Sequence, residues 1–138
     1  MKKSEHLLRR IYDRTSGYCH LCGKKLSLIN YNCSRKRGAW HIDHSKPRST
    51  GGGDNIQNLY VACIGCNSDK SNFSTKTARA WNGRARAPMS KRKRKSAKLE
   101  NALLGAGVGM FVGSLFGPLG RLIGIIAGAH IGNKANPD

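Results

Sequence analysis

Hydrophobic positions recur with helical spacing near the start of the chain. Leu7, Leu8 and Ile11 form an i, i+1, i+4 stripe within the segment from about Ser4 to Arg14. Apolar side chains at this spacing share one face of an α-helix. We therefore expect an N-terminal helix that packs on a small domain through this face.

The last forty residues follow a second pattern, in which glycine recurs at every fourth position. A period of four places glycines along one stripe of a helix, so that a second helix can approach to backbone contact. Pro118 lies where the spacing drops to three, which predicts two helices joined by a tight turn. This glycine-zipper pattern is typical of helices that pair in membranes. Its two series are Gly105, Gly109, Gly113 and Gly117, then Gly120, Gly124, Gly128 and Gly132.

The length and charge of this segment leave its partner open. Each predicted arm is shorter than the ~20 residues that cross ~30 Å of hydrocarbon. Arg121 and His130 also disfavour a simple buried span, because charge is costly at mid-bilayer. Glycine weakens an isolated helix by roughly 0.8 to 1 kcal/mol relative to alanine, so a partner is required. The alternatives for residues 102–132 are membrane contact, which we favour, soluble self-association as a homo-oligomer, and disorder.

Charge divides the chain into parts. The run from Lys91 to Lys95 contains only Lys and Arg, and such a block cannot bury itself, which predicts a flexible or nascent-helical linker. The expected organisation is a domain over residues 1–77 that includes the N-terminal helix, a basic linker over 78–100 and a helical hairpin over 101–134.

The chain is strongly basic. It has 25 Lys and Arg against 7 Asp and Glu, and 23 of the basic and five of the acidic residues lie in the first 98 positions. This part therefore carries the whole formal charge of +18. Such a concentration is typical of nucleic-acid binders, and it predicts salt-dependent attraction to DNA without sequence specificity.

Two Cys-x-x-Cys pairs, Cys19/Cys22 and Cys63/Cys66, predict a structural zinc site, because four thiolates at this spacing form a closed tetrahedral set. One alternative is a zinc ribbon that only binds. Another is two disulfides, which would leave Cys33 over. Met1 to His6 lead into no apolar stretch of the kind found in secretory signals, which disfavours disulfides. We expect a protein that stays in the cytoplasm or is delivered to a target cell, with membrane association through its tail.

Residues 5–75 carry motifs that resemble an HNH endonuclease, nearest to the zinc-clamped branch with McrA-like restriction nucleases and phage junction-resolving endonucleases. The motifs recur in the family's order. They are Cys19-His20-Leu21-Cys22, Ile42-Asp43-His44, Gly51-Gly52-Gly53, Asn55-Ile56-Gln57-Asn58-Leu59 and Cys63-Ile64-Gly65-Cys66-Asn67 with Lys70.

The resemblance implies a small α+β fold, the ββα-metal domain, here stapled by the four-cysteine zinc. The first strand would end near Asp43, the second would run from about Leu59 to Cys63, and a helix would begin near Cys66. A hydrolytic cation would lie where these elements meet.

The resemblance also implies roles for single residues. Asp43 and Asn67 resemble the ligands of the catalytic cation, and His44 resembles the general base. Asn58 resembles the motif's middle asparagine, which orients the loop between the strands. Many relatives have His where this chain has Asn67. The oxygen-only pair suits Mg²⁺ or Mn²⁺ better than zinc.

The residue chemistry agrees with these roles, because hydrolysis needs a base that titrates near neutral pH, and histidine does so with an ordinary pKa of about 6.5. Other polar residues have two interpretations. His41 is an accessory metal or phosphate contact, or a structural residue. Arg48 and Lys70 hold flanking phosphates, or are solvated charges. His20, inside a knuckle, is interpreted as a bystander.

Three functions are consistent with the sequence. The first is a metal-dependent HNH DNA endonuclease that acts as a toxin or effector, with a membrane-interacting tail and an immunity protein as partner. The second is an intracellular phage, restriction or junction-processing nuclease whose tail only oligomerises. The third, a non-catalytic zinc protein that binds nucleic acid, is disfavoured by the intact Asp43, His44 and Asn67 set.

Overall fold

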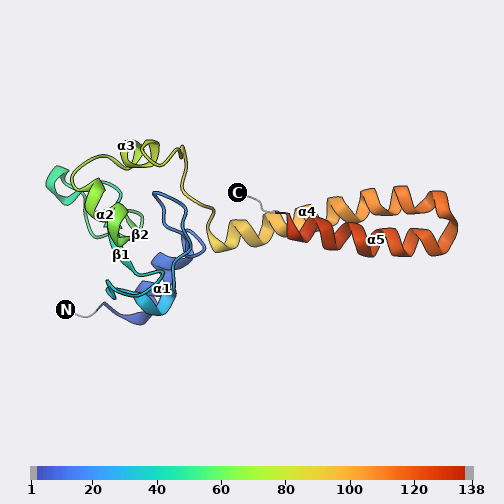
Figure 1. Ribbon diagram of the computed structural model, residues 1–138, viewed down its shortest axis with the longest axis horizontal. Helices are drawn as coiled ribbons and strands as arrows, with labels where there is room; N and C mark the ends of the chain where they lie inside the picture. The colour runs from blue at the N-terminus through green and yellow to red at the C-terminus, as the bar shows by residue number, and fades with distance from the viewer. Residues whose placement is uncertain (1–2, 136–138) are drawn as a thin grey trace. The chain divides into compact units, whose positions relative to one another are not determined.

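The computed structural model describes residues 3–135 and divides the chain into two compact units, residues 1–91 and 92–138 (Figure 1). This division differs from the three parts expected from composition. Residues 78–90 belong to the first unit, and the basic run opens a long helix instead of forming a separate linker. Lys and Arg have high helix propensity, so the run can continue the helix that follows it.

The first unit is a small α+β domain built on a two-stranded antiparallel sheet. Strand β1 (Trp40–His44) pairs with β2 (Leu59–Cys63), so that Trp40 lies opposite Cys63 and His44 opposite Leu59. Helix α2 (Ile64–Lys70) follows β2 directly and gives the ββα order that the motifs implied. The remaining elements are α1 (Glu5–Asp13), the short 3₁₀ helices η1 (Leu28–Asn30) and η2 (Arg48–Thr50), and α3 (Thr75–Ala80).

Helix α1 is the expected N-terminal helix, and the hydroxyl of Ser4 caps it by accepting from the backbone N–H of Leu7 at 3.3 Å. Ile11 is fully buried, and Leu7 and Leu8 pack against the same core. That core contains the whole indole of Trp40, whose Nε1–H donates to the Ser27 carbonyl at 2.9 Å. The core of the first unit thus packs around Trp40 of β1 and fixes the position of this strand.

The second unit is a helical hairpin made of α4 (Lys91–Gly113), η3 (Ser114–Phe116) and α5 (Gly117–Lys134). Gly117 turns the chain with a φ of +78°, and Pro118 lies in the first turn of α5. The two glycine series face each other. A Cβ built on Gly105, Gly109 or Gly113 would collide with the carbonyl oxygen of Gly128, Gly124 or Gly120, respectively. The glycines therefore form a seam at backbone contact.

The hairpin is apolar as well as closely packed. The helical stretch Lys91–Lys134 contains one 18-residue window that is long and apolar enough to cross a membrane by length and composition, with a mean hydropathy of 1.7. Only 6% of that window is buried. The hairpin therefore exposes the residues that a water-soluble helix pair would enclose.

Candidate active site and zinc centre

The four paired cysteines converge on one point. Cys19 and Cys22 lie in the turn between Tyr18 and Lys25, Cys63 ends β2, and Cys66 lies in the first turn of α2. Their sulfur atoms all lie within 4.8 Å of one another, and the sulfurs of Cys22 and Cys63 are 3.7 Å apart. A tetrahedral zinc with Zn–S bonds of ~2.3 Å has sulfur–sulfur edges of about 3.8 Å. The cluster is therefore compatible with a closed structural zinc site.

The close approach of the thiols shifts their pKa values in opposite directions when no cation is present. A hydrogen bond with Cys63 lowers the pKa of the Cys19 thiol to about 4, and the same bond raises the pKa of Cys63. Burial raises the pKa of Cys66 to about 12. Four thiolates this close need a cation to share their charge, which links metal binding to the packing of the turn against α2. All five cysteines, Cys33 included, are free thiols, so the disulfide alternative does not apply.

The loop between the two strands is closed by Asn58. Its Oδ1 accepts from the backbone N–H of Lys46 at 2.7 Å, and its Nδ2 donates to the carbonyls of Lys46 and Gly53 at 3.0 and 2.9 Å. Gly52 must lack a side chain because a Cβ there would collide with the Lys46 carbonyl oxygen. One amide thus fixes both ends of the loop, which is a positioning role rather than contact with a substrate.

This loop brings Asp54 to the side chain of His44. The Nε2 of His44 lies 2.6 Å from Asp54 Oδ1, and Arg48 Nη2 lies 2.6 and 2.8 Å from the two carboxylate oxygens. Arg48 Nε also lies 3.2 Å from His44 Nε2. Arg48 has no acceptor, so a bond from it would need an unprotonated Nε2. The shorter contact favours Nε2–H donating to Asp54, which leaves Nδ1 as the basic nitrogen.

The Asp54 carboxylate stays ionised in this arrangement. The hydrogen bonds from His44 and then from Arg48 lower its pKa to about 2. A carboxylate on Nε2–H holds the tautomer of an imidazole and stabilises the imidazolium that forms when the other nitrogen takes a proton. His44 and Asp54 thus form a base with a fixed orientation at the end of β1.

A cavity of about 320 Å³ opens beside this pair. His41, His44 and Asn67 line it together with Arg48 and Asp54. The strand end, the loop and α2 each contribute polar side chains to this one space. The structure therefore places His44 and Asn67 beside one cavity with His41 and Arg48, and adds Asp54, which the sequence analysis missed.

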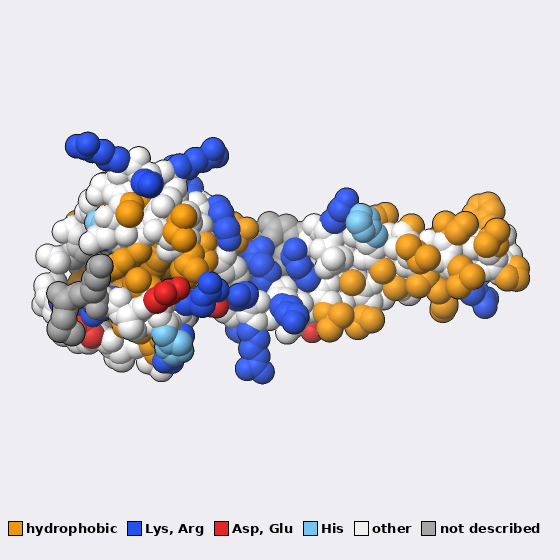
Figure 2. Space-filling model, turned by 90° about the horizontal axis from the view of Figure 1, so that it is seen from below, with side chains coloured by type: hydrophobic (Ala, Val, Ile, Leu, Met, Phe, Trp, Pro, Cys, Tyr) orange, Lys and Arg blue, Asp and Glu red, His pale blue; other side chains and the backbone are white. Residues whose placement is uncertain are grey.

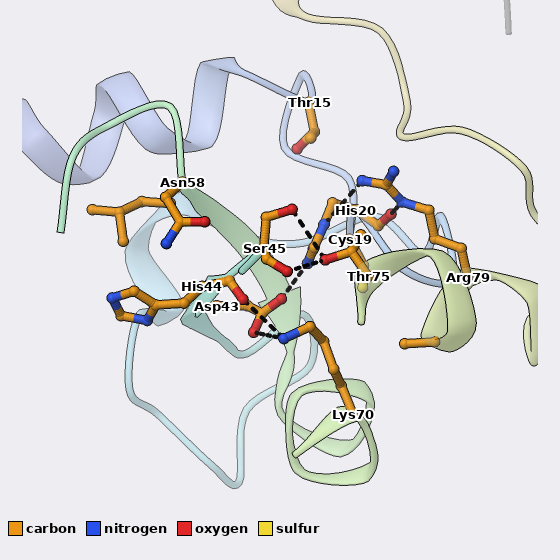
Figure 3. A network of polar contacts seen from close by, with 12 residues as sticks. Thr15, Cys19, His20, Asp43, His44, Ser45, Asn58, Lys70, Thr75 and Arg79 are labelled. Carbon is orange, nitrogen blue, oxygen red and sulfur yellow. Dashed lines mark hydrogen bonds and ion pairs between the residues drawn. The ribbon is translucent and has the colours of Figure 1, made fainter. Parts of the chain in front are cut away.

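Asp43 belongs to a second, buried network on the other side of the strand end (Figure 3). Its Oδ1 accepts from the Nζ of Lys70 at 3.0 Å, and its Oδ2 accepts from His20 Nε2 at 2.7 Å. Lys70 Nζ also donates to the His44 carbonyl at 2.8 Å. The His44 ring points away from this network in Figure 3. Adjacent strand residues face opposite sides, which accounts for the separation.

His20 is not in the sulfur cluster, as expected, but it completes the buried network around Asp43. It is fully buried, it stacks on the ring of Tyr60 at 4.8 Å between centroids, and its Nδ1 lies 3.2 Å from Arg79 Nη2. Burial lowers its pKa, so the ring is neutral, with Nε2–H facing Asp43 and Nδ1 accepting from Arg79. Sequence spacing carried no signal for this contact, because it joins residues 20, 43 and 79.

Lys70 is not placed as a phosphate contact. Its side chain is 1% exposed and is bound to Asp43, so it cannot reach a flanking phosphate from this position. Arg48 is 64% exposed but binds Asp54, which leaves part of its guanidinium free to face solvent. Neither of the two interpretations of Lys70, phosphate contact or solvated charge, holds, because the fold buries its ammonium against the Asp43 carboxylate and the His44 carbonyl.

The ligand pair expected for the catalytic cation does not fit a cation in this arrangement. Both oxygens of Asp43 already have partners, and an ammonium group lies where a second cation would approach the carboxylate. Asn67 lines the cavity beside His44, and Asp43 is not among the residues that line it. The structure thus separates Asp43 from Asn67, and we derive no chemical step through a cation on this pair.

Comparison with known protein families adds an independent finding. Residues 19–73 match the model of the HNH endonuclease family, a segment that begins at the first zinc-site cysteine and includes both strands, the loop and α2. No curated protein and no solved structure matches the chain.

Proposed function

We propose that residues 19–73, which match the HNH endonuclease family model, hydrolyse the phosphodiester bonds of DNA with His44 as general base. The observation that carries the proposal is the 2.6 Å contact between His44 Nε2 and Asp54 beside the polar cavity. It supplies an oriented imidazole at a place where a phosphate can approach.

Each residue of the pair has a defined part in the proposed reaction. Nδ1 of His44 takes a proton from water as the water oxygen bonds to phosphorus. The bond to the leaving oxygen breaks with its electron pair on that oxygen, which takes a proton from solvent. The carboxylate of Asp54 stabilises the resulting imidazolium through Nε2–H. The donors of Arg48 that do not bind Asp54 face the phosphate charge. His41 and Asn67 complete the wall of the cavity.

DNA is the proposed substrate because of charge. The formal charge of +18 is carried by the first 98 residues, which include the whole HNH segment. A polyanion is attracted to such a surface without sequence readout. HNH nucleases use divalent cations, and we propose that the cation here is Mg²⁺ or Mn²⁺, held by groups other than the Asp43–Asn67 pair. Cleavage with and without each ion tests this dependence.

The test is nicking and linearisation of plasmid DNA by the zinc-loaded full chain. Wild type, His44→Ala and the control His6→Ala, which changes an exposed histidine in α1, are compared at matched zinc content. Each is assayed with Mg²⁺, with Mn²⁺ and in buffer stripped of divalent ions without a chelator, so that structural zinc is retained. With Mg²⁺ or Mn²⁺ we expect wild type and His6→Ala to cut equally and His44→Ala to cut about 10²- to 10⁴-fold more slowly. In stripped buffer we expect no cutting.

Equal cutting by His44→Ala would remove this histidine from the mechanism. No cutting by a folded, zinc-loaded wild type on supercoiled, nicked, branched or single-stranded DNA would leave a zinc protein that only binds nucleic acid. Cutting in stripped buffer would remove the divalent cation from the proposal.

The biological setting that we propose is a toxin or effector whose tail delivers the nuclease. The exposed apolar hairpin supports delivery over an intracellular nuclease, which has no evident need of it. Such a nuclease requires an immunity protein in the producing cell. Co-expression with the product of the neighbouring gene should restore growth and inhibit DNA cutting; an intracellular restriction or junction-processing nuclease would be indifferent to it.

A further inference from the structure

The glycine seam of the hairpin is filled by the hairpin itself. Gly105, Gly109 and Gly113 are in backbone contact with the facing glycines of α5, and Gly132 approaches the Asn101 carbonyl at the open end. These are the surfaces that would otherwise bring two copies of the chain together. Because they are already occupied within one chain, the seam does not itself require a second copy.

The consequence is a helix pair with its backbone inside and its large apolar side chains outside. Phe111, Leu115 and Phe116 are 76 to 78% exposed, and Leu119 and Ile126 are each 71% exposed. Figure 2 shows hydrophobic side chains spread along the face of the hairpin that it displays. Backbone N–H and C=O groups are satisfied within the helices, so this surface has little need of water.

A protein partner would cover only one side of this surface. Beside the backbone contact, seam glycines and neighbouring apolar side chains line an open groove of about 780 Å³, which has room for another helix. Large exposed side chains outside that groove would remain in water even when it is filled. They are Leu99, Leu103, Met110, Phe111, Leu115, Leu119, Leu122 and Ile126. An apolar surface on all sides fits a surrounding apolar solvent better than a single partner.

The positions of the charges fit a bilayer that is entered from one side. Basic residues occupy the first two turns of α4, from Lys91 to Lys98, and Lys134 ends α5 at the same open end. Between Asn101 and Gly132 the one charged residue is Arg121, one turn beyond Gly117. Its side chain can extend towards headgroups on the far side. Acidic headgroups at the open end would match the basic turns.

The length of the hairpin agrees with this profile. Helix α5 has 18 residues, which is about 27 Å at ~1.5 Å per residue, against ~30 Å of hydrocarbon. The seam holds the two arms together, so they enter as one unit with the turn at Gly117 leading.

We propose that the hairpin inserts as a unit into a lipid bilayer with anionic headgroups, its basic end at the near surface and its turn at the far one. The apolar exposure on all sides, the self-filled seam and the clustered charges carry this inference. It does not depend on nuclease activity, because every residue used lies outside the HNH segment.

The experiment is flotation of the zinc-loaded full chain with phosphatidylcholine vesicles and with vesicles that also contain phosphatidylglycerol. The preference for anionic vesicles is measured at low salt. The basic domain attracts anionic lipid by itself, so the variants are compared again in salt that screens surface charge. The test variant is Ile126→Asp, on the outer face of α5. Its matched control is Ile29→Asp, which makes the same change at a side chain that is 85% exposed in the first unit.

We expect wild type and Ile29→Asp to float, more strongly with the anionic vesicles, and Ile126→Asp to lose vesicle affinity by about a hundredfold. Far-UV circular dichroism should show that Ile126→Asp keeps its helices, and plasmid cutting in solution should be unchanged. A tryptophan in Leu115→Trp should be quenched by probes placed deep in the bilayer or in the far leaflet.

Three outcomes would overturn the proposal. Equal flotation of wild type and Ile126→Asp would assign binding to the basic domain alone. Quenching of Leu115→Trp only by headgroup probes of the near leaflet would exclude insertion of the turn. Failure to float, together with a concentration-dependent dimer in sedimentation that Ile126→Asp abolishes, would make a second copy the occupant. None of these results bears on whether the HNH segment cuts DNA.

Discussion

The two units of this chain enclose opposite kinds of group. The first unit encloses Trp40, Ile11 and Val61, and its buried ammonium, that of Lys70, is paired with Asp43. The second encloses glycine backbone and turns leucine, isoleucine and phenylalanine outwards. Water favours a fold that buries its apolar side chains, whereas a fold with exposed apolar side chains is favoured by an apolar solvent. One chain can thus be built for two media.

The small apolar core of the first unit leads us to expect a large contribution of bound zinc to its stability. Nine buried hydrophobic residues form that core, which is small for a domain of this length. The second unit has no zinc ligands among its described residues. Changes at the zinc site, at the buried charge, at the glycine seam and at the surface should therefore each affect one unit and spare the other. We expect their effects on stability to decrease in that order.

The largest expected effect is loss of zinc. Cys66→Ser, or removal of zinc by a strong chelator, should unfold the first unit, because apparent zinc-binding energies of about 10 kcal/mol or more are folding energy in such sites. Near-UV circular dichroism should report the loss of packing around Trp40. Cys33→Ser is the matched control, since Cys33 lies outside the cluster, and it should keep full zinc content. Helicity of the hairpin in detergent micelles should survive both changes.

The next effect is loss of the buried ammonium. Lys70→Met would leave the Asp43 carboxylate buried beside a methyl group, which should cost about 3–5 kcal/mol of unfolding free energy. Lys76→Met, an exposed lysine on α3, is the control and should change little. Urea unfolding of the zinc-loaded chain, followed by tryptophan fluorescence, measures both. An unchanged midpoint in Lys70→Met would mean that Asp43 is not held by this pair.

A smaller effect is expected at the glycine seam. Gly109→Ala places a methyl group against the Gly124 carbonyl and should destabilise the hairpin by about 1–3 kcal/mol. Gly107→Ala has open space around its Cβ and should instead stabilise α4 by up to about 1 kcal/mol. Hydrogen exchange read by mass spectrometry should rise over residues 105–128 in the first variant and fall in the second. Similar exchange in both would contradict the seam.

The smallest effect on stability, though not on activity, is expected at Asp54. This side chain is 54% exposed, so Asp54→Asn should leave the unfolding midpoint unchanged. Plasmid cutting should fall about 10- to 100-fold, because the amide no longer stabilises the imidazolium of His44. Asp69→Asn, an exposed acid on α2, should cut normally. Normal cutting by Asp54→Asn would remove it as the positioning residue.

The same carboxylate sets a pH expectation. The pKa of Asp54 is lowered from 3.8 to about 2, so its contacts with His44 and Arg48 are fully present above about pH 4 and are lost as pH falls through about 2. Asp54 therefore stays ionised across neutral and mildly acidic assays. Any loss of cutting between pH 4 and 5 should therefore be the same in wild type and in Asp54→Asn, because Asp54 does not change its charge in that range. The pH–rate profiles of the two proteins measure this.

Local pattern predicted α1, the sulfur cluster and the helical hairpin, whereas the two strands and α2 were implied by the family resemblance and α3 was not predicted. The Leu7, Leu8 and Ile11 stripe predicted α1, the Cys-x-x-Cys spacing predicted the sulfur cluster, and Pro118 with the glycine series predicted a turn between two helices. In each case the deciding residues are neighbours in sequence or recur with a short period. The covalent geometry of the chain then limits where their side chains can lie.

Partners that are distant in sequence could be decided only by the tertiary structure. The order of the motifs predicted that Asp43, His44 and Asn67 lie together. In the structure the Asp43 carboxylate binds Lys70 and His20. His44, on the other side of the strand, contacts Asp54. The direction of a side chain at a strand end depends on the loop that follows it. Here Asn58 fixes that loop. The sequence determined which groups are available for chemistry, whereas packing determined which of them meet, because a buried charge takes the partner that the fold brings within reach.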